Sequence, residues 1–382
     1  MRVLTIIDSL AVGGAERSLS VLAPRLVAHG IDMQVGYLMD RPGVHGALVD
    51  GGVTLHSLSG AGGRSGSLTR VSQLIRRTEP SLVHTTLFEA DLAGRTAGWL
   101  RRVPVVSSLV SEAYGPEHVH NPEYRPWKVR AVQLVDATTA RLVTRFHAVS
   151  TNTADLMAER LRIPRGKIDV IPRGRDPARL GERSAERRQT ARTSLGVTDD
   201  VPLVLAVGRQ FHVKGFDLLI DAFPKVIETF QDARLIVAGR KGPATPDLVR
   251  QIRASGLDGS VTLAGFRADV AELICAADVF AFPSRSEGSP GVLLEAMALQ
   301  TPVVASDIPS VREMAGMAEP TMVLVAAASA EEWAGSIVEL LQDHKRAINL
   351  AHAGRIRFLD RYTIDMSAEA TVKFYRRAIS DH

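Results

Sequence analysis

Two glutamates separated by seven residues, Glu287 and Glu295, are the side chains whose spacing points most clearly to chemistry. They bound the segment Glu287-Gly-Ser-Pro-Gly-Val-Leu-Leu-Glu295, which follows a short apolar strand and leads into a helical pattern over 292–299. We expect Ser289 to cap this helix and Pro290 to take its first position, where a missing N–H costs nothing. The strand, loop and helix together therefore predict a helix N-terminus that points beyond the end of a strand.

A helix N-terminus is a ready binding site for anions. Gly291 also removes a side chain where a ligand would need close approach. The predicted cradle for a diphosphate consists of Gly288, Ser289, Pro290 and the first amides of the helix, on Gly291, Val292 and Leu293. Because the flanking carboxylates would repel phosphates, we expect Glu287 and Glu295 to bind sugar hydroxyls. The spacing alone leaves open a capped helix with solvated glutamates.

A second candidate for holding phosphates follows another apolar run, 201–207. Arg209 and Lys214 lie in the loop after it, and 217–229 then shows an amphipathic helical pattern. Ligands of open α/β sheets bind outside the carboxyl ends of the strands. An Arg fork with a Lys point charge is a common way to hold a diphosphate. Solvated loop cations are the alternative, but the position of both residues at one strand end favours binding.

Taken together, these residues resemble the retaining glycosyltransferases of family 4, which have the two-domain GT-B fold. The resemblance covers nearly the whole chain, and the two glutamates are its most specific signature. Other matching segments are Gly13-Gly14-Ala15-Glu16-Arg17, Val207-Gly208-Arg209, Lys214-Gly215, Leu263-Ala-Gly-Phe266, Pro283-Ser284-Arg285 and Leu294-Glu295-Ala-Met-Ala. The resemblance implies transfer of a sugar from a nucleotide-diphosphate donor with retention at the anomeric carbon.

The resemblance also implies a role for each matched residue. Glu295 would bind the ribose diol of the nucleotide, and Glu287 would lie near the donor hexose. Arg209 and Lys214 would hold the diphosphate leaving group, and Phe266 would belong to the same substrate site. The nucleotide sugar is then a substrate, and no cofactor is expected.

The first domain should supply the opposite wall of the site. Gly13 and Gly14 follow the first strand and open a helix, which exposes backbone amides at a strand end. Many relatives place a histidine after the strand that corresponds to 103–107, and the segment Ser107–Glu112 has none. His84, at the end of another strand, is the candidate to line the site instead. A hydrogen-bonded structural histidine is the alternative.

Two further departures put the identity of the sugar, rather than the reaction class, in question. The usual Pro-Asn-Gly is Pro172-Arg173-Gly174 here, and serines replace the aromatic residue usually found beside Glu287.

Alternating strand and helix patterns predict an α/β protein with parallel sheets. The strand-like runs fall in two series, at 3–7, 33–38, 53–56, 82–85, 103–107, 146–149 and 168–171, and then at 203–207, 233–237, 260–263, 279–282 and 302–305. We therefore expect two Rossmann-like domains, 1–177 on the acceptor side and 196–363 on the donor side, with 178–195 as linker. In the GT-B fold the two sheets face a central cleft. The final helix, within 364–382, should cross back to the first domain.

The composition indicates where such an enzyme would act and which partners it would bind. One cysteine, Cys275, excludes an internal disulfide and favours a reducing, cytoplasmic location, and no apolar run is long enough to span a bilayer. Residues 1–195 carry 27 Lys and Arg against 18 Asp and Glu, whereas residues 196–382 carry 19 against 24. The basic first half favours an anionic acceptor or peripheral contact with an anionic membrane. Few aromatic residues interleave with the arginines, which argues against nucleic acid as a partner.

Three functions remain after the motifs are compared. The chain has no Asp-x-Asp and no His/Cys cluster, so we expect an enzyme without a metal site. The first hypothesis is a glycosyltransferase that acts on a glycan or lipid-linked acceptor in surface-polysaccharide or glycolipid biosynthesis. The second is a nucleotide-sugar epimerase or hydrolase of the same fold, although no paired acid and base residues are evident. The third is a nucleotide-sugar-binding protein without turnover, which the absent histidine brings into consideration.

Overall fold

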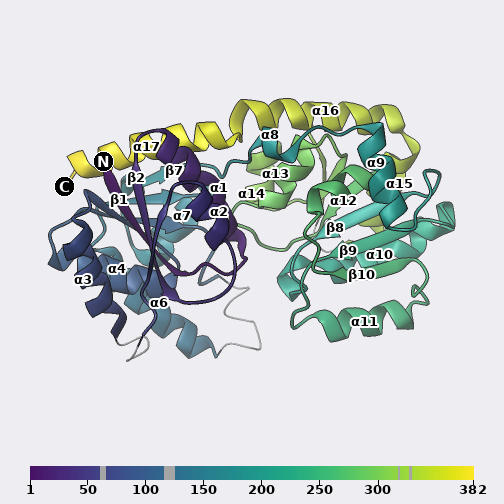
Figure 1. Ribbon diagram of the computed structural model, residues 1–382. Helices are drawn as coiled ribbons and strands as arrows, with labels where there is room; N and C mark the ends of the chain where they lie inside the picture. The colour runs from purple at the N-terminus through teal and green to yellow at the C-terminus, as the bar shows by residue number, and fades with distance from the viewer. Residues whose placement is uncertain (61–65, 116–124, 317–318, 327–328) are drawn as a thin grey trace. The chain divides into compact units, whose positions relative to one another are not determined.

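The computed structural model describes residues 1–60, 66–115, 125–316, 319–326 and 329–382 (Figure 1). The chain divides into two compact units. Unit 1 contains Met1–Gly174 and Thr363–His382, and unit 2 contains Arg175–Tyr362. Each unit is built around one parallel sheet with helices on both faces, as the alternation of strands and helices predicts.

The sheet of unit 1 has seven strands in the order β3-β2-β1-β4-β5-β6-β7, and every neighbouring pair is parallel. The strands are β1 (Arg2–Ser9), β2 (Asp32–Met39), β3 (Thr54–Ser57), β4 (Leu82–Thr86), β5 (Val105–Leu109), β6 (Arg145–Ala148) and β7 (Ile168–Val170). Alternate residues of β1 point to opposite faces and enter two separate hydrophobic cores, one with Val3 and Ile7 and one with Leu4 and Ile6.

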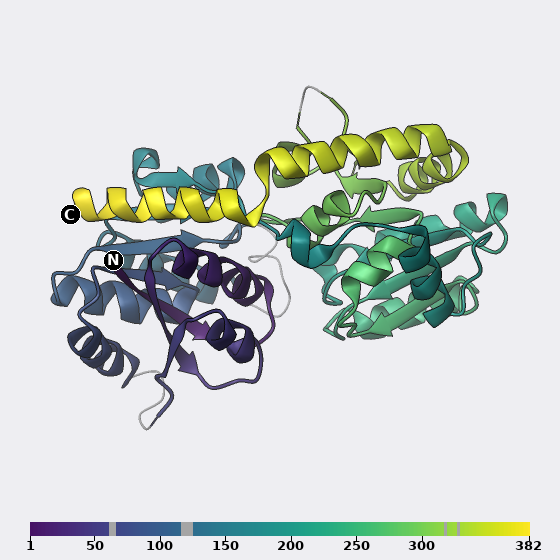
Figure 2. The same cartoon turned by 45° about the horizontal axis from the view of Figure 1, so that its top comes forward.

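Helices from both ends of the chain cover one face of this sheet. The core with Val3 and Ile7 includes residues of α1 (Gly14–Ala28), α2 (His45–Asp50) and α17 (Ile364–Ser380). Figures 1 and 2 both show the C-terminal helix α17 beside the strands of unit 1. The other face is covered by α3 (Ser67–Thr78), α4 (Phe88–Leu100), α6 (Pro126–Ala140) and α7 (Thr151–Leu161). The return of the last helix to the first unit is thus confirmed.

The sheet of unit 2 has six parallel strands in the order β10-β9-β8-β11-β12-β13. They are β8 (Leu203–Val207), β9 (Arg234–Ala238), β10 (Val261–Gly265), β11 (Val279–Phe282), β12 (Val303–Ser306) and β13 (Val323–Val325). One face packs on α9 (Ala185–Ser194), α12 (Val270–Ala276), α13 (Gly291–Ala298) and α14 (Pro309–Ala315). The other packs on α10 (Phe216–Thr229), α11 (Thr245–Ala254) and α15 (Ala330–Gln342), and α16 (His344–Arg361) contributes to both cores.

Residues 178–195, expected as a linker, are part of unit 2 in the structure. They form the end of α8 (Pro177–Leu180) and the helix α9. Arg192 is fully buried, and its Nη2 donates to Asp278 Oδ2 at 2.6 Å, while Arg188 donates to the other oxygen at 2.7 Å. A guanidinium group can be buried when it pairs with a carboxylate, whereas burial of an unpaired one is costly. The division of the chain therefore falls after Gly174 and not within this arginine-rich stretch.

Candidate functional site

The two loops that carry the predicted site of unit 2 begin at neighbouring strand ends. Strands β8 and β11 are parallel and paired, with Val204 opposite Val279. Their carboxyl ends therefore lie at the same edge of the sheet, where the loops after Val207 and Phe282 start. This edge is where ligands of open α/β sheets bind.

Contacts between the backbones hold these loops together. Gly215 has a φ of +67°, and a Cβ on it would lie 2.0 Å from the carbonyl oxygen of Pro283, so a glycine is required there. The amide of Arg285 donates to the carbonyl of Val213 at 2.8 Å. The Arg285 guanidinium then forms two hydrogen bonds to the carboxylate of Asp217, at 2.9 and 2.6 Å. The loops are thus fixed before any ligand binds.

Lys214 and Glu287, predicted to contact different parts of a donor, form an ion pair in the structure. The Nζ of Lys214, at the end of the short 3-10 helix 212–214, donates to Glu287 Oε1. Ser284 Oγ donates to the same oxygen at 2.9 Å. The side chains of Lys214 and Glu287 are 24% and 14% exposed. The pair is therefore largely sheltered but still within reach of a ligand.

Arg209, after β8, and Phe266, after β10, lie at the same edge of the sheet. Their side chains are more exposed than those of Lys214 and Glu287. The guanidinium of Arg209 lies 4.9 Å from the centroid of the Phe211 ring, and Arg209 is exposed. Phe266, just after β10, is 52% exposed, and Arg240 lies 4.9 Å from its ring centroid. Exposed rings and guanidinium groups at the ligand-binding edge are suited to contact a substrate.

The start of α13 differs by one residue from the prediction. The helix begins at Gly291, Pro290 is the residue before it, and no side chain caps this end. The extended conformation of Pro290 (ψ of 106°) lets its carbonyl accept from the amides of Leu293 and Leu294, at 3.2 and 3.4 Å. Ser289 is therefore not the cap, and the amide of Leu293 is already bonded. Gly291 and Val292 supply the first two amides of the helix.

An arginine that the motif analysis did not single out occupies the space beside Gly291. A Cβ on Gly291 would lie 1.6 Å from Nη2 of Arg175, so the glycine makes room for this guanidinium. Nε of Arg175 donates to Glu295 Oε1 at 2.7 Å, and the two side chains are 10% and 12% exposed. A lone arginine after a strand has no spacing signature, which is why the sequence did not reveal it.

In unit 1, Gly13 precedes α1 and Gly14 is its first residue, as predicted from the sequence. The carboxylate of Glu16 folds back against Gly13, since a Cβ there would lie 2.4 Å from Glu16 Oε2. Asp8, in β1, accepts from the amide of Ala90 at 2.7 Å. Burial, together with the negative charge of Glu89 and against the hydrogen bond from Ala90, raises the pKa of Asp8 to about 6. Asp8 is a titratable group beside the glycine loop that the motifs did not indicate.

His84 is part of a chain of hydrogen bonds across one face of this sheet. Nε2 of His147 lies 2.9 Å from the carbonyl of Ile171, which can only accept, so this nitrogen carries the proton. Nδ1 of His147 then accepts from Ser108 Oγ at 3.0 Å, and the Ser108 oxygen accepts from His84 Nε2 at 2.7 Å. Nδ1 of His84 is left to accept from the hydroxyl of Tyr375 in α17, at 2.7 Å. The tautomers of both histidines follow from this order.

This order requires both imidazoles to be neutral. Burial lowers the pKa of His84 to about 3 and also lowers the pKa of His147. Both ring nitrogens of His84 are engaged, so the side chain holds α17 against β4. This arrangement matches the structural alternative for His84.

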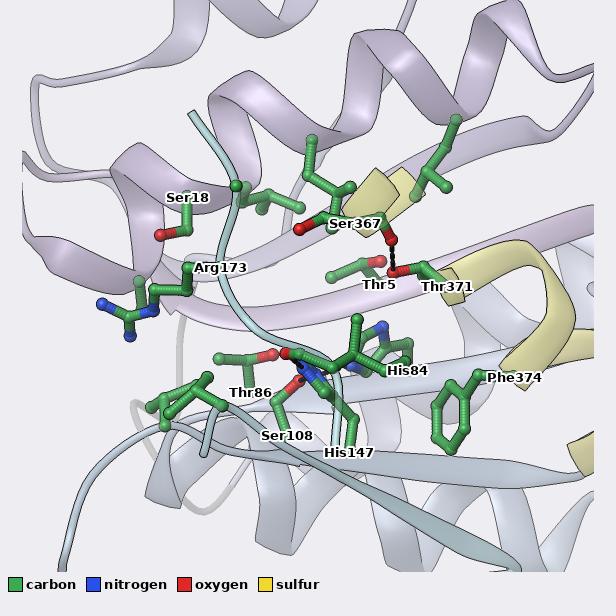
Figure 3. Close-up of a pocket in the computed structure, with 18 of the residues that line it drawn as sticks. Thr5, Ser18, His84, Thr86, Ser108, His147, Arg173, Ser367, Thr371 and Phe374 are labelled. Carbon is green, nitrogen blue, oxygen red and sulfur yellow. Dashed lines mark hydrogen bonds between the residues drawn. The ribbon is translucent and has the colours of Figure 1, made fainter. Parts of the chain in front are cut away.

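A cavity of about 80 Å³ adjoins this chain of hydrogen bonds, between the sheet, α1 and α17 (Figure 3). Figure 3 shows His84, Ser108 and His147 grouped together, with Arg173 and Ser18 at another part of the lining. The volume is several times what one water molecule needs. Oγ1 of Thr5, which also lines the cavity, is buried and has no hydrogen-bond partner among the residues that the structure describes.

Metal-binding clusters and membrane-spanning helices are both absent from the described residues. No group of three or more His, Cys, Asp or Glu side chains there is placed to hold a metal ion. Within the same ranges, each helix is too short or too polar to cross a bilayer.

Comparisons with known proteins agree on the family. The family model described as glycosyltransferase family 4 matches residues 12–179, and the model described as glycosyl transferases group 1 matches residues 201–343. The chain is 31% identical over 321 residues to the D-inositol 3-phosphate glycosyltransferase of Rhodococcus erythropolis, which covers 79% of this chain and 70% of that enzyme. It is 25% identical to the 2-deoxystreptamine glucosyltransferase of Streptomyces kanamyceticus over 82% of this chain and 81% of that enzyme.

Another match, to the D-inositol 3-phosphate glycosyltransferase of Kineococcus radiotolerans, has 34% identity but covers only 56% of this chain and 53% of that enzyme. This chain thus spans about half the length of that relative.

Solved structures show the same fold. Anabaena HepE in complex with UDP and glucose superposes with a TM-score of 0.86 over 99% of this chain and 100% of that chain, at 22% identity. Sucrose-phosphate synthase from Thermosynechococcus elongatus gives a TM-score of 0.80 at 19% identity, over 100% of both chains. With the family models and the Rhodococcus relative, these likenesses establish that this chain belongs to glycosyltransferase family 4 and has the GT-B fold.

Proposed function

We propose that this chain transfers a hexose, with retention at the anomeric carbon, from a nucleoside-diphosphate sugar to an acceptor. The observation that carries the proposal is the arrangement at one edge of the unit 2 sheet. Lys214 and Glu287 lie there as an ion pair, and Glu295 follows in the helix that begins beside them. This set supplies a cation for a diphosphate and carboxylates for sugar and ribose hydroxyls.

In the proposed reaction, Arg209 and Lys214 stabilise the diphosphate as the bond to the anomeric carbon breaks. The amides of Gly291 and Val292 add donors at the positive end of α13. Because these groups neutralise the leaving diphosphate, the mechanism requires no metal ion. Glu287 exchanges part of its contact with Lys214 for a hydroxyl of the hexose.

Retention follows if the acceptor attacks on the face that the diphosphate leaves. The departing phosphate oxygen then accepts the proton of the acceptor hydroxyl, so no protein base is needed. The protein holds donor and acceptor in reacting geometry, which can supply a large part of the rate enhancement. This agrees with a His84 whose two ring nitrogens are already bonded.

For the acceptor, we propose unit 1 as the binding unit and a glycan or lipid-linked intermediate of surface-polysaccharide or glycolipid synthesis as its class. The glycine loop at α1 and the cavity lined by Ala15, Ser18, Thr86 and Arg173 support this placement. The names of the relatives that act on D-inositol 3-phosphate and 2-deoxystreptamine support a second candidate, a small cyclitol. Both classes present hydroxyls on a ring.

We further propose peripheral contact of unit 1 with an anionic membrane through α6. Trp127, Leu134 and Val135 are 61%, 70% and 46% exposed, and their spacing places them on one side of the helix. Lys128 and Arg130 are also exposed on this helix. An exposed apolar stripe flanked by basic residues is typical of helices that lie in the membrane interface.

Turnover with a panel of donors tests the proposed reaction. The protein is incubated with UDP-, GDP- and ADP-hexoses, with and without D-inositol 3-phosphate and lipid-linked glycan acceptors, and nucleotide release and products are measured. Glycosyl transfer requires nucleotide release and a new glycoside when donor and acceptor are both present. Full nucleotide release without acceptor would indicate a hydrolase, an altered nucleotide sugar an epimerase, and binding without any product a non-catalytic protein.

A further inference from the structure

Arg175 is the first residue of unit 2, and its side chain lies beside Glu295 in the proposed nucleotide site. Its amide donates to the carbonyl of Tyr362 at 2.9 Å, which joins the first and last residues of unit 2. Its side chain reaches from there to Glu295, with 2.7 Å between Nε and Oε1. The position of this guanidinium is thus fixed at both ends of the residue, by a backbone bond and by an ion pair.

Gly291 completes the place that Arg175 occupies. A Cβ on Gly291 would lie 1.6 Å from Nη2 and 2.6 Å from Cζ of Arg175, far inside any van der Waals contact. The guanidinium therefore lies directly against the first residue of α13. Alanine at position 291 would force the guanidinium to leave this place.

We propose that Arg175 is a positioning residue that sets the orientation of the Glu295 carboxylate for the ribose diol, and that Gly291 is required because Arg175 occupies its side-chain space. The inference rests on the proposed role of Glu295 in nucleotide binding. A carboxylate that accepts from two neighbouring hydroxyls needs a fixed plane. The charge-assisted bond from Nε provides one, because it ties Oε1 to a guanidinium that lies against Gly291, in a residue whose backbone is bonded to Tyr362.

The inference separates ribose recognition from general affinity. Without Arg175, Glu295 keeps its charge but loses the bond that orients it, so binding of the ribose weakens while contacts to the diphosphate remain. The loss of affinity caused by removing Arg175 should be smallest for a nucleotide that lacks the 2′-hydroxyl. The ratio of affinities for the ribonucleotide and the 2′-deoxynucleotide is therefore the readout, and a merely structural role of Arg175 would not change it.

The first experiment measures dissociation constants by calorimetry. The probes are the tightest binder among UDP, GDP and ADP and its 2′-deoxy analogue, and the proteins are wild type, Arg175→Ala, Arg175→Lys and Glu295→Gln. Wild type should prefer the ribonucleotide by about tenfold or more, as expected for hydroxyls bonded to a carboxylate. Arg175→Ala should reduce this preference to about threefold or less, and Arg175→Lys should restore it only partly, since lysine lacks the Nε donor and the planar fork.

The possible results distinguish failure of the inference from failure of the proposed role of Glu295. An unchanged preference in Arg175→Ala, with Glu295→Gln impaired, overturns the inference and leaves the proposed function intact. An unchanged preference in Glu295→Gln shows instead that Glu295 does not bind the ribose, so the proposed role of that residue fails as well. Tighter nucleotide binding by Arg175→Ala contradicts the inference too, since Arg175 would then compete with the ribose.

A double-mutant cycle tests the pairing with Gly291. Gly291→Ala alone should lower the ribose preference as Arg175→Ala does, because the methyl group displaces the guanidinium. In the Arg175→Ala background the same methyl group enters vacated space and should change the preference by less than twofold. Equal losses in both backgrounds would mean that position 291 must be small for the phosphate and not for Arg175. Melting temperatures of all variants report whether unit 2 remains folded.

Discussion

At the scale of single residues, the cations after β8 have different surroundings. Lys214 is held by Glu287, whereas Arg209 is exposed and lies over Phe211. If both stabilise the leaving diphosphate, each should contribute in the transition state more than in the ground state. Such a contribution appears in kcat rather than in KM.

Arg209→Ala and Lys214→Ala should each lower kcat by roughly 100- to 1000-fold, because loss of one stabiliser of developing charge costs about 3–4 kcal/mol. Arg250→Ala removes an exposed charge from α11 and is the matched control. Steady-state kinetics on the folded variants measure the effect. Near-normal turnover in Arg209→Ala would remove that residue from the mechanism.

Glu287 and Glu295 should act on different parts of the donor. Glu295→Ala should weaken binding of the free nucleoside diphosphate by at least about tenfold, since hydrogen bonds to a charged group contribute about 1.5–3 kcal/mol. Glu287→Ala should weaken binding of the intact sugar nucleotide more than that of the bare nucleotide. Calorimetric titration of both ligands checks this, and the reverse pattern would mean that the two roles are exchanged.

The structure also shows why part of the site could be predicted from the sequence and part could not. Lys214 and Glu287 lie in loops after predicted strands, and Glu295 lies within the predicted helix that follows Glu287, so their common sheet edge follows from the parallel topology. Arg175 is not distinguished by spacing, since its partner Glu295 lies 120 residues away. Tyr375 meets His84 across 291 residues, and no local pattern encodes that contact.

At the scale of elements, the predicted strands are found because apolar runs between helices identify buried parallel strands well. β13 (Val323–Val325) is not among the predicted strands. Residues 178–195 were misread for a physical reason. Their arginines suggest a solvated segment, yet Arg192 is buried against Asp278. A charged side chain is expected to be exposed only when no oppositely charged partner is available to it.

The hydrogen bonds that hold α17 against β4 should depend on pH. In the folded chain the pKa of His84 is lowered to about 3 from 6.5, so its contribution to stability is complete above pH 6.5 and is lost as the pH falls from 6.5 towards 3. His84→Gln cannot take up this proton. Only the wild type therefore loses this part of its stability as the pH falls. The difference in the free energy of unfolding between wild type and His84→Gln should shrink by about 2 kcal/mol between pH 7.5 and pH 5.

Protection factors of β4 amides from native-state hydrogen exchange at the two pH values measure this difference. Asp8 and Asp91, whose burial raises each pKa to about 6, are present in both proteins and cancel. His352→Gln, exposed on α16, is the control and should leave the protection of β4 unchanged. A pH-independent difference would show that His84 is not the group that titrates.

At the scale of the whole molecule, the charge of the two units differs less than that of the two halves of the sequence. Unit 1 carries 24 Lys and Arg against 18 Asp and Glu, and unit 2 carries 22 against 24. The difference arises because arginines such as Arg188 and Arg192 belong to unit 2 and pair with Asp278 there. The excess of unit 1 is therefore smaller than the first half of the chain suggests, which gives α6 a larger share in the proposed membrane contact.

Sedimentation with vesicles tests that contact. The protein should bind vesicles rich in anionic lipid at low salt and dissociate at high salt, because attraction is worth about 1 kcal/mol per basic residue near the surface and is screened by ions. Trp127→Ala with Leu134→Ser should reduce binding, and Ile348→Ser, which changes an exposed residue of unit 2, should not. Equal binding to neutral vesicles, or none to either kind, would contradict the proposal.

In the proposed reaction, a sugar passes from a nucleoside-diphosphate donor to an acceptor on the face that the diphosphate leaves. The most direct measurement is the anomeric configuration of the product, determined by NMR from the one-bond coupling between the anomeric carbon and its proton. An α-linked donor should give an α-glycoside, formed together with one equivalent of nucleoside diphosphate. A β-glycoside would contradict the proposed mechanism, whatever the sugar or the acceptor.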